Sequence, residues 1–517
     1  MAIDDPVQGA DSPRAATEKP NDKKADDKKA DDKKADDKKT SAKKANGGGK
    51  PAAPTTTWGA VRPLVLRLHF YAGLLVAPLL LIAATSGLLY SLSYQAEKVV
   101  YRQELRSPDS DRTAMLSQQV EAARAEHPDG KVTAVWPSSE DEESTRILMT
   151  MPDSEESKSL AVFVDPHTAQ IRGELDSYGS SGALPLRTWL SELHRHLHLG
   201  EPGRIYSELA ASWLWVVALG GLLLWIGRRR TSKRALLRPE RGATGRRRTL
   251  SRHGSLGMWA AAGFLALSAT GLTWSTYAGE NIGAVQDQLG GATPVVSAEL
   301  KSGEGAGAGA GGHEGHGGDS GAGGDHEGMD IGFDNALTAA RQAGLDGPVT
   351  VKPPADGTAY VVAQRDSQFP LRLDSVSVDP GTGLILDELR FADYPLLAKL
   401  TRIGIDAHMG LTFGVVNQLL LAALALSLIL IIVWGYRMWW QRRPTQDRRA
   451  GVGKPMARGA WRKVPLSVLL PLIAAAALVG WFVPLLGITL VAFLVLDVVL
   501  GAVARARAAR AGAAAGG

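Results

Sequence analysis

Residues 67–90 read RLHFYAGLLVAPLLLIAATSGLLY, an apolar run with a histidine near its start and enough length to cross a bilayer. A second run, RHGSLGMWAAAGFLALSATGL at residues 252–272, carries the same landmarks at the same spacing. The matched positions are His69, Gly73, Gly87 and Leu88 in the first run and His253, Gly257, Gly271 and Leu272 in the second. This repetition predicts a chain built from two copies of one membrane unit.

The segments that follow the two runs also match one another, at a constant offset of 214 positions. The matched pairs are Val164-Asp165-Pro166 with Val378-Asp379-Pro380, His194 with His408, Gly200 with Gly414, Gly221 with Gly435, Trp225 with Trp439, and Arg228-Arg229 with Arg442-Arg443. A register that holds from a soluble turn to the end of a helix indicates internal duplication. Because each unit has two spans, the copies are expected to lie parallel, related by an axis along the membrane normal.

Hydropathy predicts about six transmembrane helices. Four of them occupy residues 61–90, 209–227, 253–277 and 415–436. The apolar stretch 464–504 is too long for one span and is interrupted by Gly480-Trp481-Phe482-Val483-Pro484. It therefore predicts a hairpin of two helices.

The distribution of arginine and lysine predicts the orientation of these spans. Basic residues crowd the segments 228–252 and 437–463 and recur in the tail 505–517. By the positive-inside rule these segments are cytoplasmic, and 91–208 and 278–414 are external. The sequence thus predicts a multi-pass protein of the cytoplasmic membrane with both termini inside. Basic patches also occur in nucleic-acid-binding proteins, but here they adjoin spans and lack interleaved aromatic residues, which argues against nucleic acid.

Composition limits the chemistry. The chain has no cysteine, which excludes disulfides, thiolate iron–sulfur clusters and Cys-linked haem. Residues 1–60 contain a Lys-Lys-Ala-Asp-Asp repeat and almost nothing to bury, so they predict a disordered cytoplasmic tail. Its alternative role is weak contact with anionic lipid.

The two external segments are typical of small α+β domains. Residues 113–126 and 334–343 have the apolar spacing of amphipathic helices. Each is followed by alternating strand-like runs, such as 159–164 and 375–378, and by an Asp-Pro turn that predicts a hairpin. The predicted fold is therefore a membrane α-helical protein with α+β external domains.

These motifs resemble the PepSY-associated transmembrane proteins, also called iron-regulated membrane proteins. The resemblance covers roughly residues 62–503. It rests on Leu193-His194-Arg195 with Gly200-Glu201-Pro202-Gly203-Arg204, on Arg67, His69 and Gly73 with Ser86-Gly87, and on the two Val-Asp-Pro hairpins. The second outer motif, Asp406-Ala407-His408-Met409-Gly410, departs from the Leu-His-Arg form. The resemblance implies PepSY-like external domains and a haem-bearing reductase of ferric siderophores.

Four histidines at span ends are the candidate cofactor ligands, because ionisable groups in a membrane usually mark function. His69 and His253 lie near the cytoplasmic ends of spans one and three, and His194 and His408 precede spans two and four. Two symmetric layers match two bis-histidine b-type haems, with His69 and His253 at the inner one and His194 and His408 at the outer. The alternatives are interfacial side chains bonded to carbonyl groups, or a lone structural metal.

The outer layer poses a length problem. A continuous helix from His194 to Arg228 would measure roughly 50 Å at ~1.5 Å per residue, well beyond the ~30 Å core. Either the helix breaks near residues 200–203 or the outer haem lies at the external surface. His196 and His198 are substitute ligands, although His194 needs no gap in the register.

Two other groups of residues are candidates for ligand binding. Arg67 and Arg252 could pair with haem propionates or could snorkel at the membrane boundary. In the Gly/His-rich loop 303–329, His313, His316 and His326 could hold a metal ion weakly, or the loop could be an unselective linker.

The sequence has no dinucleotide or P-loop signature, so the electrons are expected to come from elsewhere. The predicted function is a transmembrane electron conduit that reduces a ferric siderophore or another ferric chelate outside, fed by an unknown cytoplasmic or quinol donor. One alternative is a PepSY-type binding or peptidase-regulating membrane protein without redox activity. The other is a metal transporter that uses the parallel repeats and the histidines.

Overall fold

The computed structural model describes residues 57–515 except 109–112, 141, 156, 229–235, 301–329 and 443–457. The predicted tail 1–60 therefore lies almost entirely outside the described residues, and the Gly/His-rich loop does so for 303–329.

Within the described residues, five helices are long and apolar enough to cross a membrane. They are α1 (Thr57–Val100), α5 (Glu201–Ile226), α6 (Gly245–Leu272), α10 (Gly414–Trp440) and α12 (Pro484–Ala515). A sixth, α11 (Leu466–Phe482), is apolar but shorter. At ~1.5 Å per residue α1 measures roughly 66 Å, so it extends well past a ~30 Å hydrocarbon core.

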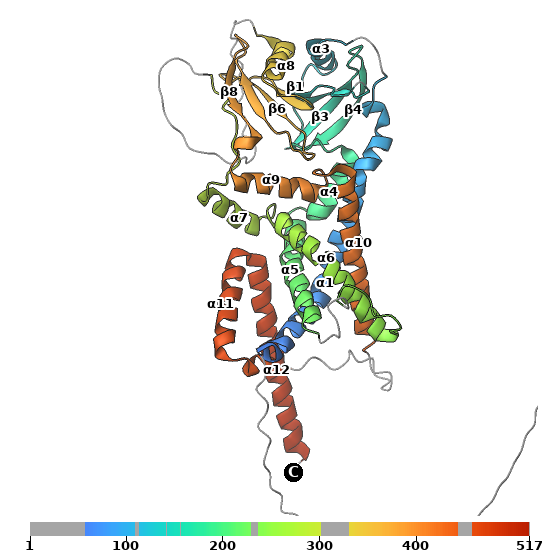
Figure 1. Ribbon diagram of the computed structural model, residues 1–517, viewed down its shortest axis with the longest axis vertical. Helices are drawn as coiled ribbons and strands as arrows, with labels where there is room; N and C mark the ends of the chain where they lie inside the picture. The colour runs from blue at the N-terminus through green and yellow to red at the C-terminus, as the bar shows by residue number, and fades with distance from the viewer. Residues whose placement is uncertain are drawn as a thin grey trace, which may run out of the picture. The chain divides into compact units, whose positions relative to one another are not determined.

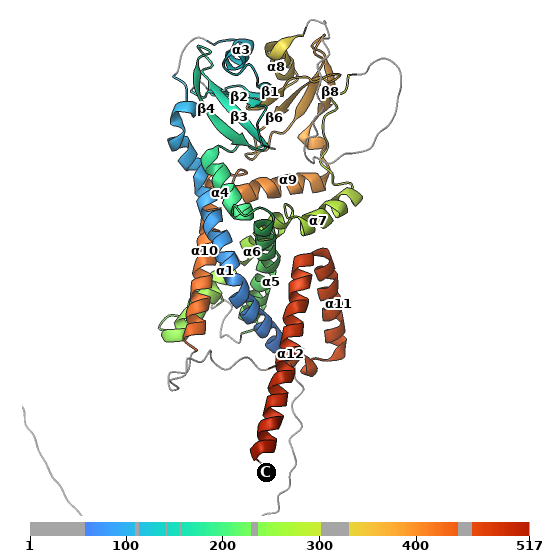
Figure 2. The ribbon, with the colours of Figure 1, turned by 180° about the vertical axis from the view of Figure 1, so that it is seen from behind.

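Four of these helices, α1, α5, α6 and α10, form a bundle. Each contacts two neighbours, in the cyclic order α1, α5, α6, α10 (Figures 1 and 2). The equivalent first helices of the two predicted repeats, α1 and α6, thus lie across a diagonal. The bundle core contains both small and large apolar side chains, including Ala72, Leu80, Ala260 and Phe264.

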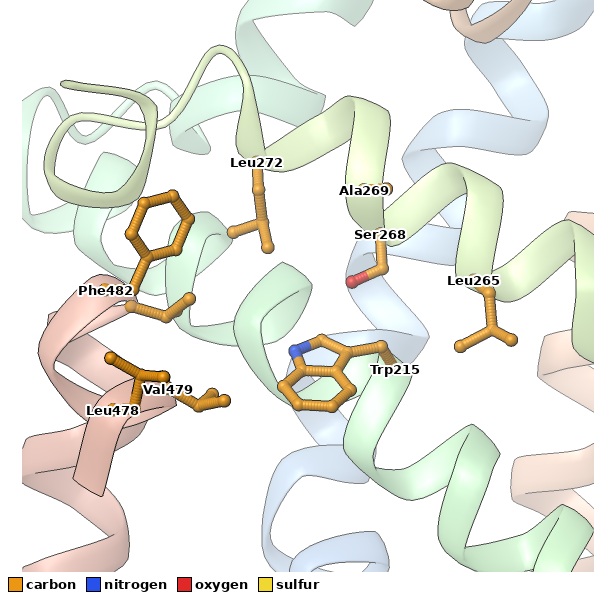
Figure 3. Close-up of a pocket in the computed structure, with 9 residues that line it drawn as sticks. Trp215, Leu265, Ser268, Ala269, Leu272, Leu478, Val479 and Phe482 are labelled. Carbon is orange, nitrogen blue, oxygen red and sulfur yellow. The ribbon is translucent and has the colours of Figure 1, made fainter. Parts of the chain in front are cut away.

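The terminal hairpin of α11 and α12 packs beside α5. The Trp213 Nε1–H donates to Thr489 Oγ1 at 2.9 Å, and the Asn281 amide donates to the Phe482 carbonyl at 3.0 Å. The chain reverses at Val483, where the Gly-Pro-containing interruption predicts it. Between α11 and the bundle is a cavity of about 590 Å³ with apolar walls. Figure 3 shows Trp215 of α5 and Phe482 of α11 facing this space.

At one end of the bundle the strands form a single antiparallel sheet in the order β4-β3-β2-β1-β5-β6-β7-β8. The strands are β1 (Lys131–Trp136), β2 (Thr145–Thr150), β3 (Lys158–Val164), β4 (Ile171–Tyr178), β5 (Val349–Lys352), β6 (Tyr360–Gln364), β7 (Ser375–Val378) and β8 (Ile385–Leu389). The seam between the four strands of each half is the β1–β5 pair, in register at Val135 and Val351. The two segments predicted as α+β domains therefore share one sheet.

Helices α3 (Leu116–Glu126) and α8 (Gly332–Gln342) cover one face of this sheet, close to their predicted positions. Alternate strand residues from both halves pack beneath them, among them Ile147, Val162 and Val376. The two helices are linked directly, because the Asp334 carboxylate accepts the backbone N–H of Leu116 at 2.7 Å. This bond satisfies a donor that a helix N-terminus would otherwise leave free.

The two Asp-Pro turns are built alike and confirm the predicted hairpins. The Asp165 carboxylate accepts the N–H groups of His167 and Thr168, at 2.8 and 3.1 Å. The Asp379 carboxylate accepts those of Gly381 and Thr382, at 2.9 and 2.8 Å. Backbone N–H groups in a turn have no partner on a neighbouring strand, and the two carboxylates accept their hydrogen bonds instead.

Several short helices lie between the sheet and the bundle (Figure 1). They are α2 (Arg102–Leu105), α4 (Pro185–His196), α7 (Tyr277–Gln288), η2 (Phe391–Asp393) and α9 (Leu396–Met409), and η3 (Ala460–Lys463) precedes α11. The helix that contains His194 ends at His196, and α5 begins at Glu201. Leu197 and His198 have positive φ values of 56° and 54°, so the chain turns sharply there. The helix between His194 and Arg228 is therefore broken, which is one of the two arrangements predicted from its length.

Candidate functional site

The first candidate site is a pair of imidazoles inside the bundle. His69 of α1 and His253 of α6 face each other with their ring centroids 6.3 Å apart and their planes at 74°. His69 Nδ1 lies 2.9 Å from the carbonyl oxygen of Val217, and His253 Nδ1 lies 3.0 Å from that of Ile431. A carbonyl oxygen only accepts, so Nδ1 carries the proton in both rings. The Nε2 lone pairs are thereby left available to a ligand.

Glycines on the neighbouring helices provide the space for this pair. A Cβ at Gly221 of α5 would lie 2.9 Å from His69 Cε1, closer than side chains approach. The matched Gly435 of α10 is less tight, since a Cβ there would lie 4.0 Å from His253 Cε1. Glycine is therefore required at Gly221 by close approach of the imidazole.

The second candidate site is formed by His194 of α4 and His408 of α9. His194 Nδ1 lies 2.9 Å from Ser86 Oγ, and His408 Nδ1 lies 2.7 Å from Thr270 Oγ1. Both hydroxyls donate their own proton to a helix carbonyl one turn back, at Ile82 and Ala266. Their oxygens therefore accept from Nδ1–H, which leaves Nε2 unprotonated in this pair too.

The environment of the second pair favours neutral imidazoles. Burial lowers the pKa of His194, and burial together with the proximity of His194 lowers the pKa of His408 to about 4. Metal ions are bound by neutral imidazole, so the two side chains are in the protonation state that ligation needs.

The other histidines of the His194 segment point elsewhere. The His198 ring lies against Trp189 at a centroid distance of 5.0 Å, and its Nδ1 is 3.3 Å from a Glu192 carboxylate oxygen. His196 Nδ1 is buried without a hydrogen-bond partner. Of the three candidates, His194 is the one that contacts α1, at Ser86, and that contributes to the lowered pKa of His408.

The two predicted propionate partners differ in their surroundings. Arg67 forms an ion pair with Asp497 of α12 and lies over the ring of Tyr71 at 5.2 Å. Asp497 also pairs with Arg458 at 3.2 Å. Arg252 is exposed. Arg67 thus links α1 to the terminal hairpin through an ion pair, and the sequence does not predict this pair.

The predicted loop metal ligands His313, His316 and His326 lie outside the described residues. In the parts of the chain that are described, no three His, Cys, Asp or Glu side chains gather as a metal site. The candidate donor sets are therefore pairs of imidazoles.

The two halves make the same contacts at matched positions. Residues of α1 and α6 correspond at an offset of 184, and those of the segments through α5 and α10 at 214. The corresponding sets are His69, Ser86, Gly87, His194, Val217 and Gly221 in the first half and His253, Thr270, Gly271, His408, Ile431 and Gly435 in the second. The sequence predicts the histidines and glycines but not the acceptors at Val217 and Ile431, since a backbone carbonyl leaves no mark in a sequence. Ser86 belongs to a predicted motif, but its bond to His194 is not predicted.

The family model described as the PepSY-associated TM region matches residues 66–442, more than half of the chain. The match includes the sheet, all four paired histidines and the bundle helices apart from the first residues of α1. No curated protein matches the chain.

Proposed function

The chain belongs to the PepSY-associated transmembrane family, and we propose that it is a di-haem b electron-transfer protein of the cytoplasmic membrane. The single observation that carries the proposal is the facing pair of His69 and His253, both with Nδ1 bonded to a carbonyl oxygen and Nε2 available. The pair of His194 and His408 repeats this chemistry with hydroxyl acceptors.

The spacing of the inner pair suits one iron held by two imidazoles. With metal–nitrogen bonds of about 2.0 Å, two imidazoles that held one iron between them would have their ring centroids roughly 6 Å apart. His69 and His253 lie at 6.3 Å. The ring planes are fixed by the Nδ1 bonds, which also raise the basicity of the ligating nitrogen.

The two pairs are spaced as a conduit across a bilayer requires. From His69 to Ser86, the contact of His194, α1 advances 17 residues, or roughly 26 Å. This approaches the ~30 Å thickness of the hydrocarbon core. The pairs would therefore serve opposite sides of the membrane.

The positive-inside rule supports the orientation of the conduit. The His69 and His253 end of the bundle adjoins the arginine-rich start of α6, with Arg246, Arg247 and Arg248. We therefore place this end in the cytoplasm and the sheet outside. Both termini would then face inwards, as the distribution of basic residues predicts.

When bound, haem supplies an iron that alternates between Fe(III) and Fe(II) and so carries one electron at a time. The chain's own residues hold and orient that group, keep Nδ1 protonated and exclude water from the bundle. The net reaction that we propose takes one electron from a cytoplasmic reductant or a membrane quinol and reduces Fe(III) of an external chelate to Fe(II). The choice of a ferric siderophore or another ferric chelate rests on the resemblance described above.

An optical titration of the purified full-length protein tests the proposal. We expect two haems per chain, reduced by dithionite and reoxidised by a ferric siderophore. A colourless protein that takes up no added haem would refute the proposal and favour a binding or peptidase-regulating role. Haem that stays reduced in the presence of ferric chelates would refute the acceptor while leaving the cofactor intact.

A further inference from the structure

Beneath the sheet, on the face opposite α3 and α8, two arginines lie against one tryptophan. Trp136, at the end of β1, is only 7% exposed. The guanidinium carbon of Arg146 lies 4.8 Å from its ring centroid and that of Arg365 lies 4.4 Å from it. The Trp136 ring therefore holds two cationic groups from the two halves of the chain.

Arg146 reaches the ring from β2, where it is paired in register with Trp136. It also lies 5.0 Å from the Phe163 ring, and its Nη1 donates to the Gly182 carbonyl at 2.9 Å. Within the described residues it has no ion pair. Aromatic contacts fix the plane of a guanidinium group but neutralise none of its charge.

Arg365 approaches from the other side of the seam, just after β6. Its Nε is buried without a hydrogen-bond partner. Among the described residues its side chain makes neither a hydrogen bond nor an ion pair, so the Trp136 ring is its principal contact. The N–H of Arg365 Nε is therefore a buried donor that a bound ligand could satisfy.

A third arginine belongs to the same cluster. Arg187 of α4 is 7% exposed, and its Nη2 lies 3.2 Å from the Gly182 carbonyl oxygen that Arg146 also reaches. Its charge is balanced by Glu97, at 2.9 Å. A Cβ on Gly182 would lie 2.1 Å from the Trp136 ring, so glycine allows this carbonyl to approach both arginines.

Three arginines form this cluster, and Glu97 is the carboxylate that forms an ion pair with one of them, Arg187, within the described residues. Burial, and then the charges of Arg365 and Arg187, lower the pKa of Arg146 to about 9. Burial lowers the pKa of Arg365, and the carboxylates of Glu143 and Asp366, which form no ion pair with it among the described residues, offset this only in part. Partly buried cations without a counter-ion are unfavourable, and an anion bound between them would remove that cost.

We propose that Arg146 and Arg365, held against Trp136, form a binding site for a carboxylate group. The planar guanidinium fork matches a carboxylate in a bidentate geometry, and the fixed ring orients both forks before the ligand arrives. Because Arg365 comes from the second half and Arg146 from the first, the ligand would bridge the seam of the sheet.

Two sources could supply this carboxylate. Both presuppose the proposed function, so the proposal rests on it. One is a ferric chelate whose ligands are carboxylates, bound on the external side. The other is a propionate of the haem held by His194, since Arg187 precedes His194 by two turns of α4, roughly 10 Å.

Calorimetric titration of the full-length protein with iron-free citrate tests the site directly. We expect citrate to bind the wild type, and Arg365→Gln and Arg146→Gln to weaken binding roughly tenfold or more, as the loss of a charged hydrogen bond does. Arg365→Lys keeps the charge and should lose less. The matched control is Arg106→Gln, which removes an arginine of an exposed ion pair with Glu142 and should leave the Kd unchanged.

Haem occupancy and midpoint potential of the same variants, measured without citrate, separate the two sources. Weaker citrate binding with unchanged haem properties assigns the site to the external chelate. Absent citrate binding, with altered occupancy or potential in Arg365→Gln but not in Arg106→Gln, assigns it to a propionate. If Arg365→Gln changes neither citrate binding nor the haem properties, the proposal is wrong. If Arg365→Gln does not fold, the same measurements on Arg365→Lys decide. A protein without haem would refute the proposed function but leave the citrate titration readable.

Discussion

Ser86 Oγ and His194 Nδ1 lie 2.9 Å apart, and the hydroxyl that accepts this bond gives its own proton to the carbonyl of Ile82. The hydroxyl therefore selects one tautomer of the imidazole. Thr270 does the same for His408 at 2.7 Å. The chain thus prepares both imidazoles of the outer pair before any ligand is present.

Ser86→Ala is expected to weaken haem binding at the outer pair. The variant removes the acceptor of the His194 Nδ1–H, and loss of such a partner lowers metal affinity by about tenfold or more. Haem titration of the apoprotein measures the effect. Thr85→Ala is the matched control, because Thr85 is exposed and its hydroxyl donates to the Leu81 carbonyl. Equal losses in both variants would argue against a tautomer-setting role.

His69→Ala or His253→Ala is expected to remove the inner haem and leave the outer one largely intact, because each pair is built from separate contacts. Haem content per chain should fall from two to one. His198→Ala should keep both haems, since its ring packs on Trp189. Loss of both haems from His69→Ala would point to a folding defect or to a different pairing.

Gly221→Ala and Gly435→Ala occupy matched positions but should differ in effect. The new Cβ at Gly221 meets the His69 ring at 2.9 Å, whereas that at Gly435 has an ordinary contact of 4.0 Å with His253. Displacement of His69 should lower inner haem occupancy severalfold in the first variant only. Absorption spectra of the two proteins, purified in parallel, make the comparison. Identical spectra would show that the inner pair tolerates the displacement.

Asp379→Ala is expected to destabilise the second hairpin by about 1 kcal/mol at pH 7, because the turn loses a charged acceptor of two N–H groups. The N–H of Thr382 holds the pKa of Asp379 below its usual range. The carboxylate therefore contributes stability above its unfolded pKa of about 3.9, and this contribution is lost as the pH falls through the lower folded value.

Thermal unfolding of wild type and Asp379→Ala between pH 7 and pH 3 measures that contribution. The difference in Tm should narrow at the acidic end. Asp379→Asn keeps an acceptor oxygen without a charge, so it should preserve the turn and show less pH dependence. A gap that stays constant across the range would contradict the ionised-carboxylate explanation.

Much of the fold follows from sequence because its signals are local. Apolar runs of sufficient length predict the bundle helices, and the Asp-Pro turns predict the hairpins at Asp165 and Asp379. The shared sheet is a different matter. β5 has only four residues, and its pairing with β1 joins positions 135 and 351, so neither periodicity nor proximity in sequence indicates the seam.

The candidate site shows the same division. Matched register identifies His69 with His253 and His194 with His408, because repeated sequence repeats side-chain chemistry. It leaves out the acceptors Val217 and Ile431, which act through backbone carbonyls. It also leaves out Arg365, since a cation that packs on a tryptophan 229 positions away has no sequence motif.

Antiparallel pairing of β1 with β5 is a contact that two identical subunits can also form about a twofold axis. A polypeptide of half this length, carrying one histidine of each pair, would reproduce the sheet and both donor sets by dimerising. A single chain that carries both halves differs from a homodimer in one respect, because each half can change independently. The hydroxyl beside His194 comes from Ser86 and that beside His408 from Thr270, and Gly221 lies closer to its imidazole than Gly435 does. Such differences allow two otherwise equivalent imidazoles to be tuned separately.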